Sequence, residues 1–262
     1  AREILVGRNW RNLPMVVPVG VLGIANLLMH LEADGVAVPS GLGWRLGLTT
    51  VIVLISVMAG RIVPSFTRNW LAKRPGSKLP GSHGWVDKLA LGILHAGLIG
   101  WAFLPAFWPV GLLLLLGAAI NLWRLLRWRG FATAAEPLLL ILHVGYAWLV
   151  LGVALLGAAL VGADVPLNAA IHTLTAGAIG TMILAVMTRA TRGHVGRALS
   201  ADRRTILIYG LVTLAAIMRV AAAFAAIWIM PLLIISAGLW IAAFAGFALS
   251  YGPMLLLPRR AR

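Results

Sequence analysis

Residues 110–120 read VGLLLLLGAAI, a run of consecutive positions without a single charged side chain. Residues 211–217, LVTLAAI, are similar, and neither run offers the polar groups that would cover a surface in water. Of the 262 residues, 61% are hydrophobic and 11% charged, whereas a soluble domain is about half apolar and about a quarter charged. Hydrocarbon is therefore the expected surrounding of these segments.

Apolar runs of roughly 20 residues recur along the chain, and each is long enough to cross a hydrocarbon core about 30 Å thick. A spanning barrel would instead alternate in polarity over segments of about ten residues. The sequence thus predicts an all-α fold, a polytopic transmembrane helix bundle forming a single domain over residues 1–262. The eight predicted spans are residues 13–31, 42–63, 86–104, 107–123, 137–163, 165–187, 206–229 and 231–257.

The formal net charge is +15, and 20 of the 22 lysine and arginine residues fall at the chain ends and in alternate connections between spans. This placement indicates membrane topology rather than nucleic-acid binding. By the positive-inside rule the basic side is cytoplasmic, so both termini are expected inside the cell. The longest connection, residues 61–87, is rich in proline, glycine and lysine and is predicted to be a cytoplasmic loop.

Cysteine is absent, which excludes disulfides, thiolate metal sites and thiol nucleophiles. A few ionisable side chains do lie inside the apolar spans, where each costs roughly 2.5 to 3.5 kcal/mol and therefore indicates a functional site. The candidate cofactor-binding residues are His30, His95, His143, His172 and Arg219.

The expected depths of these residues fall into two levels. His30, His172 and Arg219 lie towards the outer side and could meet, whereas His95 and His143 lie nearer the cytoplasmic side and form a second candidate pair. Two imidazoles from facing helices can hold a haem iron axially, so all four histidines are candidate metal ligands. The alternative is that each histidine only bonds a neighbouring carbonyl.

The guanidinium of Arg219 and the thioethers of methionine could also take part in cofactor binding. The guanidinium of Arg219 cannot lose its proton and needs an anion, such as a haem propionate or an acidic residue of the outer loops, unless it snorkels to the interface. Thioethers could bind copper(I), although methionine is more often a packing residue. The acidic candidates are Glu32, Asp34 and Asp164, and the thioether candidates are Met29, Met182 and Met187.

Two basic segments follow spans: GRIVPSFTRNW at residues 60–70 and MTRATRGHVGR at residues 187–197. Their small residues are expected to allow tight turns, and their cationic and hydroxyl groups could hold an anion, although charges that set orientation are the alternative. Together with HTLTAGAIGTM at residues 172–182 and LHVGYAW at residues 142–148, they resemble the motifs of the NnrS family over essentially the whole chain. The matching motif residues are Arg61, Phe66, Thr67, Asn69, His143, His172, Arg189, His194 and Arg197.

The resemblance implies a multi-pass protein of the bacterial inner (cytoplasmic) membrane that contains haem of the b type and copper. It also implies a link to denitrification and to nitric oxide or nitrosative stress, without a defined reaction. Arg192 and Val195 depart from the family pattern, which more usually has an apolar residue and a threonine there. Family members typically have about twelve spans, so the first four are expected to be missing here, in line with a chain that starts at Ala1.

Three functions follow as hypotheses: a haem protein, with copper as a second metal, that senses, binds or detoxifies nitric oxide; a transporter with a polar path between its spans; and a scaffold subunit of a larger membrane complex. A haem–copper oxidase is a poor alternative, because it would require several clustered histidines, including adjacent ones, and no two histidines are adjacent in the sequence. Motifs of soluble enzymes are also absent from the sequence.

Overall fold

The computed structural model describes residue 7 and residues 16–256. Within these ranges every regular element is helical, and eight helices are long and apolar enough to cross a membrane, which confirms the predicted multi-pass bundle. The outermost ends of the first and last predicted spans lie outside the described residues. The elements are α2 (Val16–Ala33), α3 (Leu42–Leu71), α4 (Trp85–Phe103), α5 (Trp108–Arg127), η2 (Gly130–Thr133), α6 (Pro137–Leu160), α7 (Leu167–His172), η3 (Thr173–Ile179), α8 (Gly180–His194), α9 (Arg203–Ala221), η4 (Ala226–Trp228) and α10 (Ile229–Leu256).

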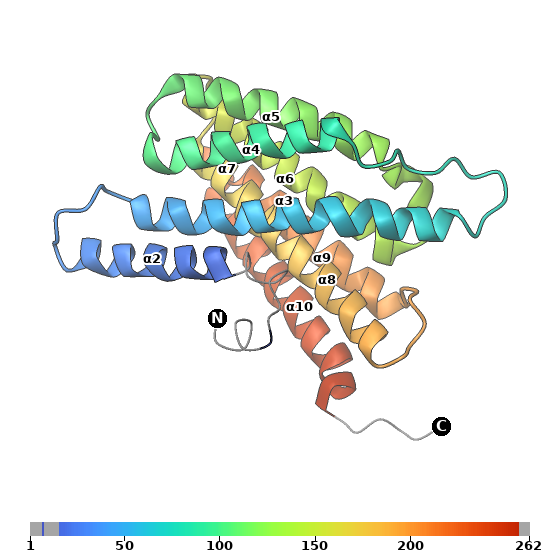
Figure 1. The fold of residues 1–262 in the computed structure, drawn as a ribbon. Coiled ribbons are helices and arrows are strands. Elements are labelled where there is room, and N and C mark those ends of the chain that lie inside the picture. Colours follow the sequence, from blue (N-terminus) through green and yellow to red (C-terminus); the bar gives the residue numbers. More distant parts are fainter. Residues whose placement is uncertain (1–6, 8–15, 257–262) are drawn as a thin grey trace.

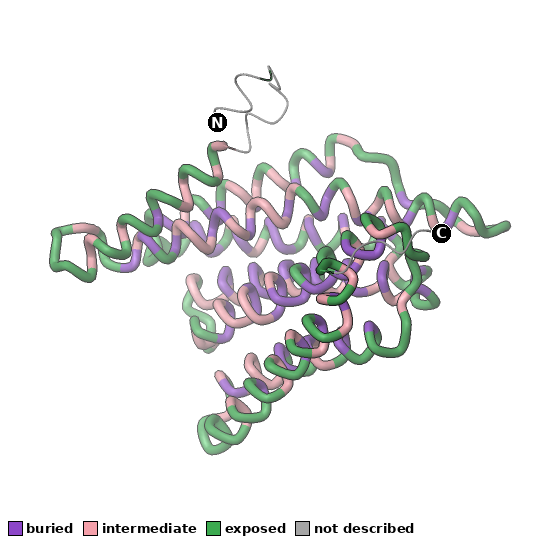
Figure 2. Tube along the Cα trace, turned by 90° about the horizontal axis from the view of Figure 1, so that it is seen from below, coloured by how far each residue is buried: buried purple, intermediate pink, exposed green. Residues whose placement is uncertain are grey.

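Helix α6 is the centre of the bundle, and 61% of its apolar segment is buried inside the protein. It packs against α3, α5, α7, η3 and α8 (Figure 1). By contrast, only 6% of the apolar segment of α2 and 17% of the apolar segment of the span that contains α10 are buried. The reason is that α2 packs mainly on α3 and α10 mainly on α9. Buried positions accordingly line the inner faces of the helices, and exposed positions lie outside (Figure 2).

The contact between α5 and α6 depends on two facing glycines. A β-carbon at Gly111 would lie 2.8 Å from the carbonyl oxygen of Gly157, and a β-carbon at Gly157 would lie 2.8 Å from the carbonyl oxygen of Gly111. Small residues let membrane helices approach to backbone contact, which replaces the hydrophobic driving force that is missing between helices in lipid. This close approach joins the α4–α5 pair to α6.

The structure corrects the predicted loop at residues 61–87. Helix α3 continues through Pro64 to Leu71, and α4 starts at Trp85, so the connection is only residues 72–84. Buried side chains at Val63, Thr67 and Leu71 follow one another at four-residue spacing and keep one face of α3 packed beyond the proline. This packing offsets the backbone hydrogen bond that the proline ring removes.

Two other predicted boundaries are also wrong. The predicted span at residues 206–229 joins two elements, since α9 ends at Ala221 and α10 starts at Ile229 after the short helix η4. The predicted span at residues 165–187 is a continuous stretch of α7, η3 and α8 that runs on to His194. Residues 173–179 of this stretch form a π-helix, which apolar periodicity did not indicate.

Candidate functional site

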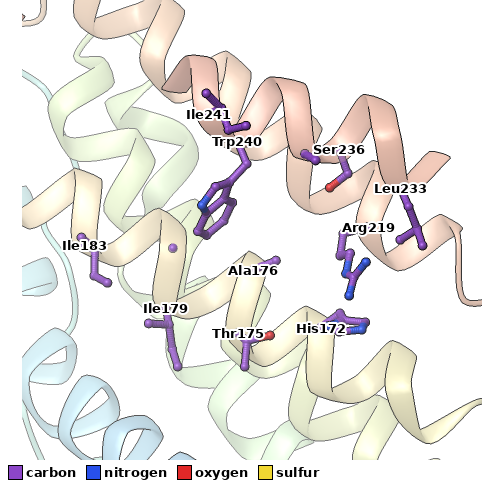
Figure 3. Close-up of a pocket in the computed structure, with 12 residues that line it drawn as sticks. His172, Thr175, Ala176, Ile179, Ile183, Arg219, Leu233, Ser236, Trp240 and Ile241 are labelled. Atoms are coloured by element: carbon purple, nitrogen blue, oxygen red, sulfur yellow. The ribbon is translucent and has the colours of Figure 1, made fainter. Parts of the chain in front are cut away.

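A cavity of about 430 Å³ lies between the stretch formed by α7, η3 and α8 and the facing α9–α10 pair (Figure 3). Most of its wall consists of isoleucine, leucine, alanine and glycine. The polar and aromatic lining residues are His172, Thr175, Arg219, Ser236 and Trp240. Such an apolar hollow with a few polar groups is the usual form of a site for a small molecule or cofactor.

His172 and Arg219 form the polar end of this cavity. His172 is the last residue of α7, and Arg219 lies in the last turn of α9. Both are half-buried, and Figure 3 shows their side chains pointing towards one another from opposite walls. The structure thus brings together two of the three groups predicted to meet near the outer side.

Arg219 has no acidic partner at this site. Its lining contains no Asp or Glu, and no salt bridge within 4.0 Å involves Arg219 in the described ranges 7 and 16–256. Of the carboxylates predicted to neutralise it, Glu32 instead accepts hydrogen bonds from the Ser40 hydroxyl and the Gly41 backbone N–H. The guanidinium is therefore a fixed positive charge at the polar end of an apolar cavity, which favours an anionic group beside it.

The π-helix η3 begins directly after His172. A π turn closes each hydrogen bond one residue later than an α turn, and such segments are frequent at functional sites. Two hydroxyls support the local backbone: Thr173 donates to the Ala169 carbonyl at 2.7 Å, and Thr175 donates to the Ile171 carbonyl at 2.8 Å. This widened segment forms the wall of the cavity next to the histidine.

Trp240 borders the cavity at a point further along α8 and α10. Its ring lies directly against Gly180, where a β-carbon would collide with the indole. It also packs on Phe244, with ring centroids 4.8 Å apart. The aromatic ring therefore fills the space between α8 and α10 and forms an apolar surface inside the cavity (Figure 3).

His143 lies elsewhere, in the core of the bundle. Only 5% of it is exposed, and its Nε2 forms a 2.9 Å hydrogen bond with the Thr67 hydroxyl. Its Nδ1 has no hydrogen-bond partner and packs so closely on Gly130 that a β-carbon there would lie 2.7 Å from the nitrogen. Nε2 is thus engaged with a hydroxyl and Nδ1 lies against the backbone, and the metal-ligand role of His143 stays a prediction.

The predicted pairing of His95 with His143 is not observed. His95 Nε2 lies 2.8 Å from the Ser56 hydroxyl, whereas His143 bonds Thr67. Because Ser56 and Thr67 are eleven residues apart on α3, the two rings contact that helix about 16 Å apart along its axis. One iron cannot bind both.

His30 is also outside the cavity lining. It is an exposed residue of α2, a helix that packs mainly on α3, so it does not join His172 and Arg219. Across the described part of the chain, no group of three or more His, Cys, Asp or Glu side chains could hold a metal ion. Of the candidate thioethers, Met182 is buried against Gly145, and Met29 and Met187 are exposed.

The motif segments are helical rather than turns. Residues 60–70 belong to α3 and residues 187–194 to α8, so the expected tight turns are confined to the residues after His194, where Gly196 has a φ of 70°. Arg189 connects the two segments, because its guanidinium lies 4.1 Å from the centroid of the Phe66 ring.

The candidate anion-binding residues of these segments divide into two groups. Arg61, Asn69, His194 and Arg197 are exposed, and Thr67 is fully buried in its bond with His143. Arg189 is half-buried and its charge lies on an aromatic face. Thr67 and Arg189 are thus engaged with His143 and Phe66, and the anion-binding role of the six side chains stays a prediction.

Sequence reasoning missed a buried ion pair at one end of α4 and α5. Arg124, only 1% exposed, donates from Nε to Asp87 at 2.8 Å and from Nη1 to the Tyr146 hydroxyl at 2.9 Å. Tyr146 in turn donates to Asn121 at 2.6 Å. In the sequence Arg124 is one of the basic residues that indicate topology, whereas Asn121, a polar residue one turn earlier in an apolar run, is the signal for this network.

Arg192, which departs from the family pattern, has its own partners. It donates to the Tyr251 hydroxyl at 3.0 Å and pairs with Asp202, the N-cap residue of α9. Burial disfavours the ionised form of Asp202, but hydrogen bonds from the Thr205 N–H and hydroxyl and the charge of Arg192 outweigh this penalty. They lower the pKa of Asp202 below its usual value and tie α8, α9 and α10 together.

Comparison with known proteins identifies the family of the chain. Neither a curated protein nor a solved structure matches the chain. A family model described as NnrS protein matches residues 1–259, nearly the full length, including the motif segments and the stretch from His172 to Met182. The chain is therefore a multi-pass membrane protein that belongs to the NnrS family.

Proposed function

We propose that this protein binds haem of the b type in the cavity between η3, α8, α9 and α10. Its proposed role is to bind nitric oxide in the bacterial inner membrane during denitrification or nitrosative stress. The observation that carries the proposal is the opposition of His172 and Arg219 across one apolar cavity. The proposal combines this geometry with the haem content that is expected for the NnrS family.

The residues of the cavity fit the chemical groups of a haem. His172 supplies an imidazole, the usual iron ligand. Arg219 supplies a positive charge without an acidic partner at the site, which suits a propionate carboxylate. Trp240 and the aliphatic side chains supply an apolar wall for a porphyrin ring.

The same lining explains why a gas is the proposed ligand. Apart from His172, it contains no histidine or methionine that could provide a second strong protein ligand. His172 would hold the iron of a bound haem, and the haem would supply the chemistry of binding a diatomic gas. The protein residues would hold the cofactor, neutralise its acid groups and exclude water from the open side.

Copper belongs to the proposal only at the level of the family. We assign it no residues, because the described residues contain no group of three or more His, Cys, Asp or Glu side chains able to hold a metal. His95 and His143 are each engaged with a hydroxyl of α3, and Met182 is packed on Gly145.

A transport path is less well supported. The glycines of the sixth span, which could line such a path, are covered by tryptophans: Trp148 packs on Gly177 and Trp240 on Gly180. The histidines at the second level face α3 rather than the cavity. A scaffold role in a larger complex stays a prediction.

The test is the haem content of the purified protein. We expect a Soret band and a reduced-minus-oxidised haem spectrum that His172→Ala abolishes, while His30→Ala, a matched control at an exposed histidine outside the cavity, leaves both unchanged. Arg219→Leu should increase haem dissociation about tenfold or more, since a charge-assisted hydrogen bond contributes about 1.5–3 kcal/mol. Full haem content in His172→Ala would show that the ligand assignment is wrong.

A further inference from the structure

We propose that the cavity receives its gaseous ligand from the hydrocarbon layer, through the opening between α8 and α10 that Ile183 and Ile241 border. This inference rests on the haem function proposed above and names the class of molecule that the site admits: small, uncharged, lipid-soluble gases. It concerns the route to the site rather than the cofactor.

The first observation is the exposure of the residues at that border. Ile183 is 41% exposed and Ile241 is 66% exposed, although both line the cavity. They belong to helices that are long and apolar enough to span the membrane, so their outer surfaces face acyl chains rather than water. The wall of the cavity is thus continuous with the lipid-facing surface.

The second observation is the packing of α10. This helix packs extensively along α9 but only lightly on α8, and the ring of Trp240 against Gly180 is what fills the space between α8 and α10. Ile183 lies three residues beyond Gly180 on α8, and Ile241 directly follows Trp240 on α10. The opening is therefore bordered by one aromatic ring and two aliphatic side chains, whose rotamer changes are fast and local.

The third observation is the separation of charge along the cavity. Arg219 and His172 lie at one end, whereas Ile183 lies eleven residues after His172, about three helical turns away. Among the described residues that line the cavity, Arg219 is the only one with a permanent charge. A molecule that enters past the isoleucines meets a mostly apolar lining before it reaches the charged end. Such a lining admits a neutral gas and imposes a large desolvation cost on an anion such as nitrite.

The experiment measures how fast carbon monoxide, a light-releasable haem ligand, rebinds to the reduced protein in lipid vesicles after flash photolysis. Ile183→Trp and Ile241→Trp should slow bimolecular rebinding several-fold, because the larger indole side chain narrows the opening between α8 and α10. Ile183→Ala combined with Ile241→Ala should accelerate it. Ile234→Trp is the matched control, because Ile234 is 67% exposed on the same helix and does not line the cavity.

The outcomes separate the two proposals. If every variant has a normal Soret band and rebinds carbon monoxide at the rate of the unaltered protein, the lipid route is wrong and the haem assignment stands. If the unaltered protein has no Soret band, the haem function is wrong and the route is wrong with it. If a tryptophan variant loses haem, the double alanine variant decides, since an unchanged rate there would also contradict the route.

Discussion

Arg124 and Asp87 show how a single charged residue is kept inside an apolar bundle. The guanidinium is 1% exposed and has Asp87 and the Tyr146 hydroxyl as partners, while its Nη2 has no partner and lies directly against Gly60. Removing one partner of a buried ion pair leaves the other charge uncompensated and costs about 3–5 kcal/mol. The stability of this end of the bundle should therefore depend strongly on Asp87.

We expect Asp87→Asn to lower the free energy of unfolding by about 3–5 kcal/mol, because it leaves the Arg124 charge buried without a counter-charge. Asp34→Asn is the control, since Asp34 is exposed and has no salt bridge in the described part of the chain. Unfolding in mixed detergent micelles, followed by circular dichroism, measures both. Asp87→Asn combined with Arg124→Leu should recover part of the loss, and equal stability of all three variants would contradict a buried ion pair.

The histidines show what sequence could and could not supply at the scale of the residue. Length and hydropathy placed His95, His143 and His172 inside spans, and this placement is confirmed. Depth along a span says nothing about which way a side chain points around the helix axis. The hydroxyls of Ser56 and Thr67, which engage His95 and His143, therefore could not be foreseen, and only His172 reaches the cavity.

At the scale of the element, the contact of α5 with α6 should be sensitive to a single methyl group. We expect Gly111→Ala to destabilise the protein by about 1–3 kcal/mol, since the added β-carbon would meet the Gly157 carbonyl, a backbone atom that cannot rotate away. Gly92→Ala in α4 is the matched control. It has open space within 4 Å and should stabilise the helix by about 0.5–1 kcal/mol. Thermal unfolding in detergent distinguishes these opposite signs.

The elements were predictable where one physical rule dominates. Runs of apolar residues long enough to cross a bilayer predict the number of membrane-spanning helices, since lipid leaves no backbone N–H or C=O group without a hydrogen-bond partner. The extension of α3 beyond Pro64 was not predictable, because a proline normally ends a helix and only the buried face at Thr67 and Leu71 overrides it. The π-helix at residues 173–179 escaped prediction for a related reason, since its composition is that of any apolar helix.

At the scale of the whole molecule, the charge pattern predicts both termini and the connection at residues 72–84 in the cytoplasm. The absence of cysteine allows a direct test, because a single introduced thiol is the only one in the chain. In intact spheroplasts, a membrane-impermeant maleimide should label Ala37→Cys, which is exposed between α2 and α3, and should not label Ser82→Cys until the cells are broken. The reverse labelling pattern would show that the orientation is inverted.

The π-helix also sets the rotational phase between the two halves of the sixth span. His172 precedes it and faces Arg219, while Gly180 follows it and receives the Trp240 ring, so both halves face the same neighbours only because of the extra residue per turn. If the same residues formed a regular α-helix, the extra residue would turn one half by about 100° relative to the other. The imidazole of His172 and the surface of Gly180 that contacts Trp240 could then no longer face the same cavity. The π-helix thus keeps the two ends of the site on one side of the span.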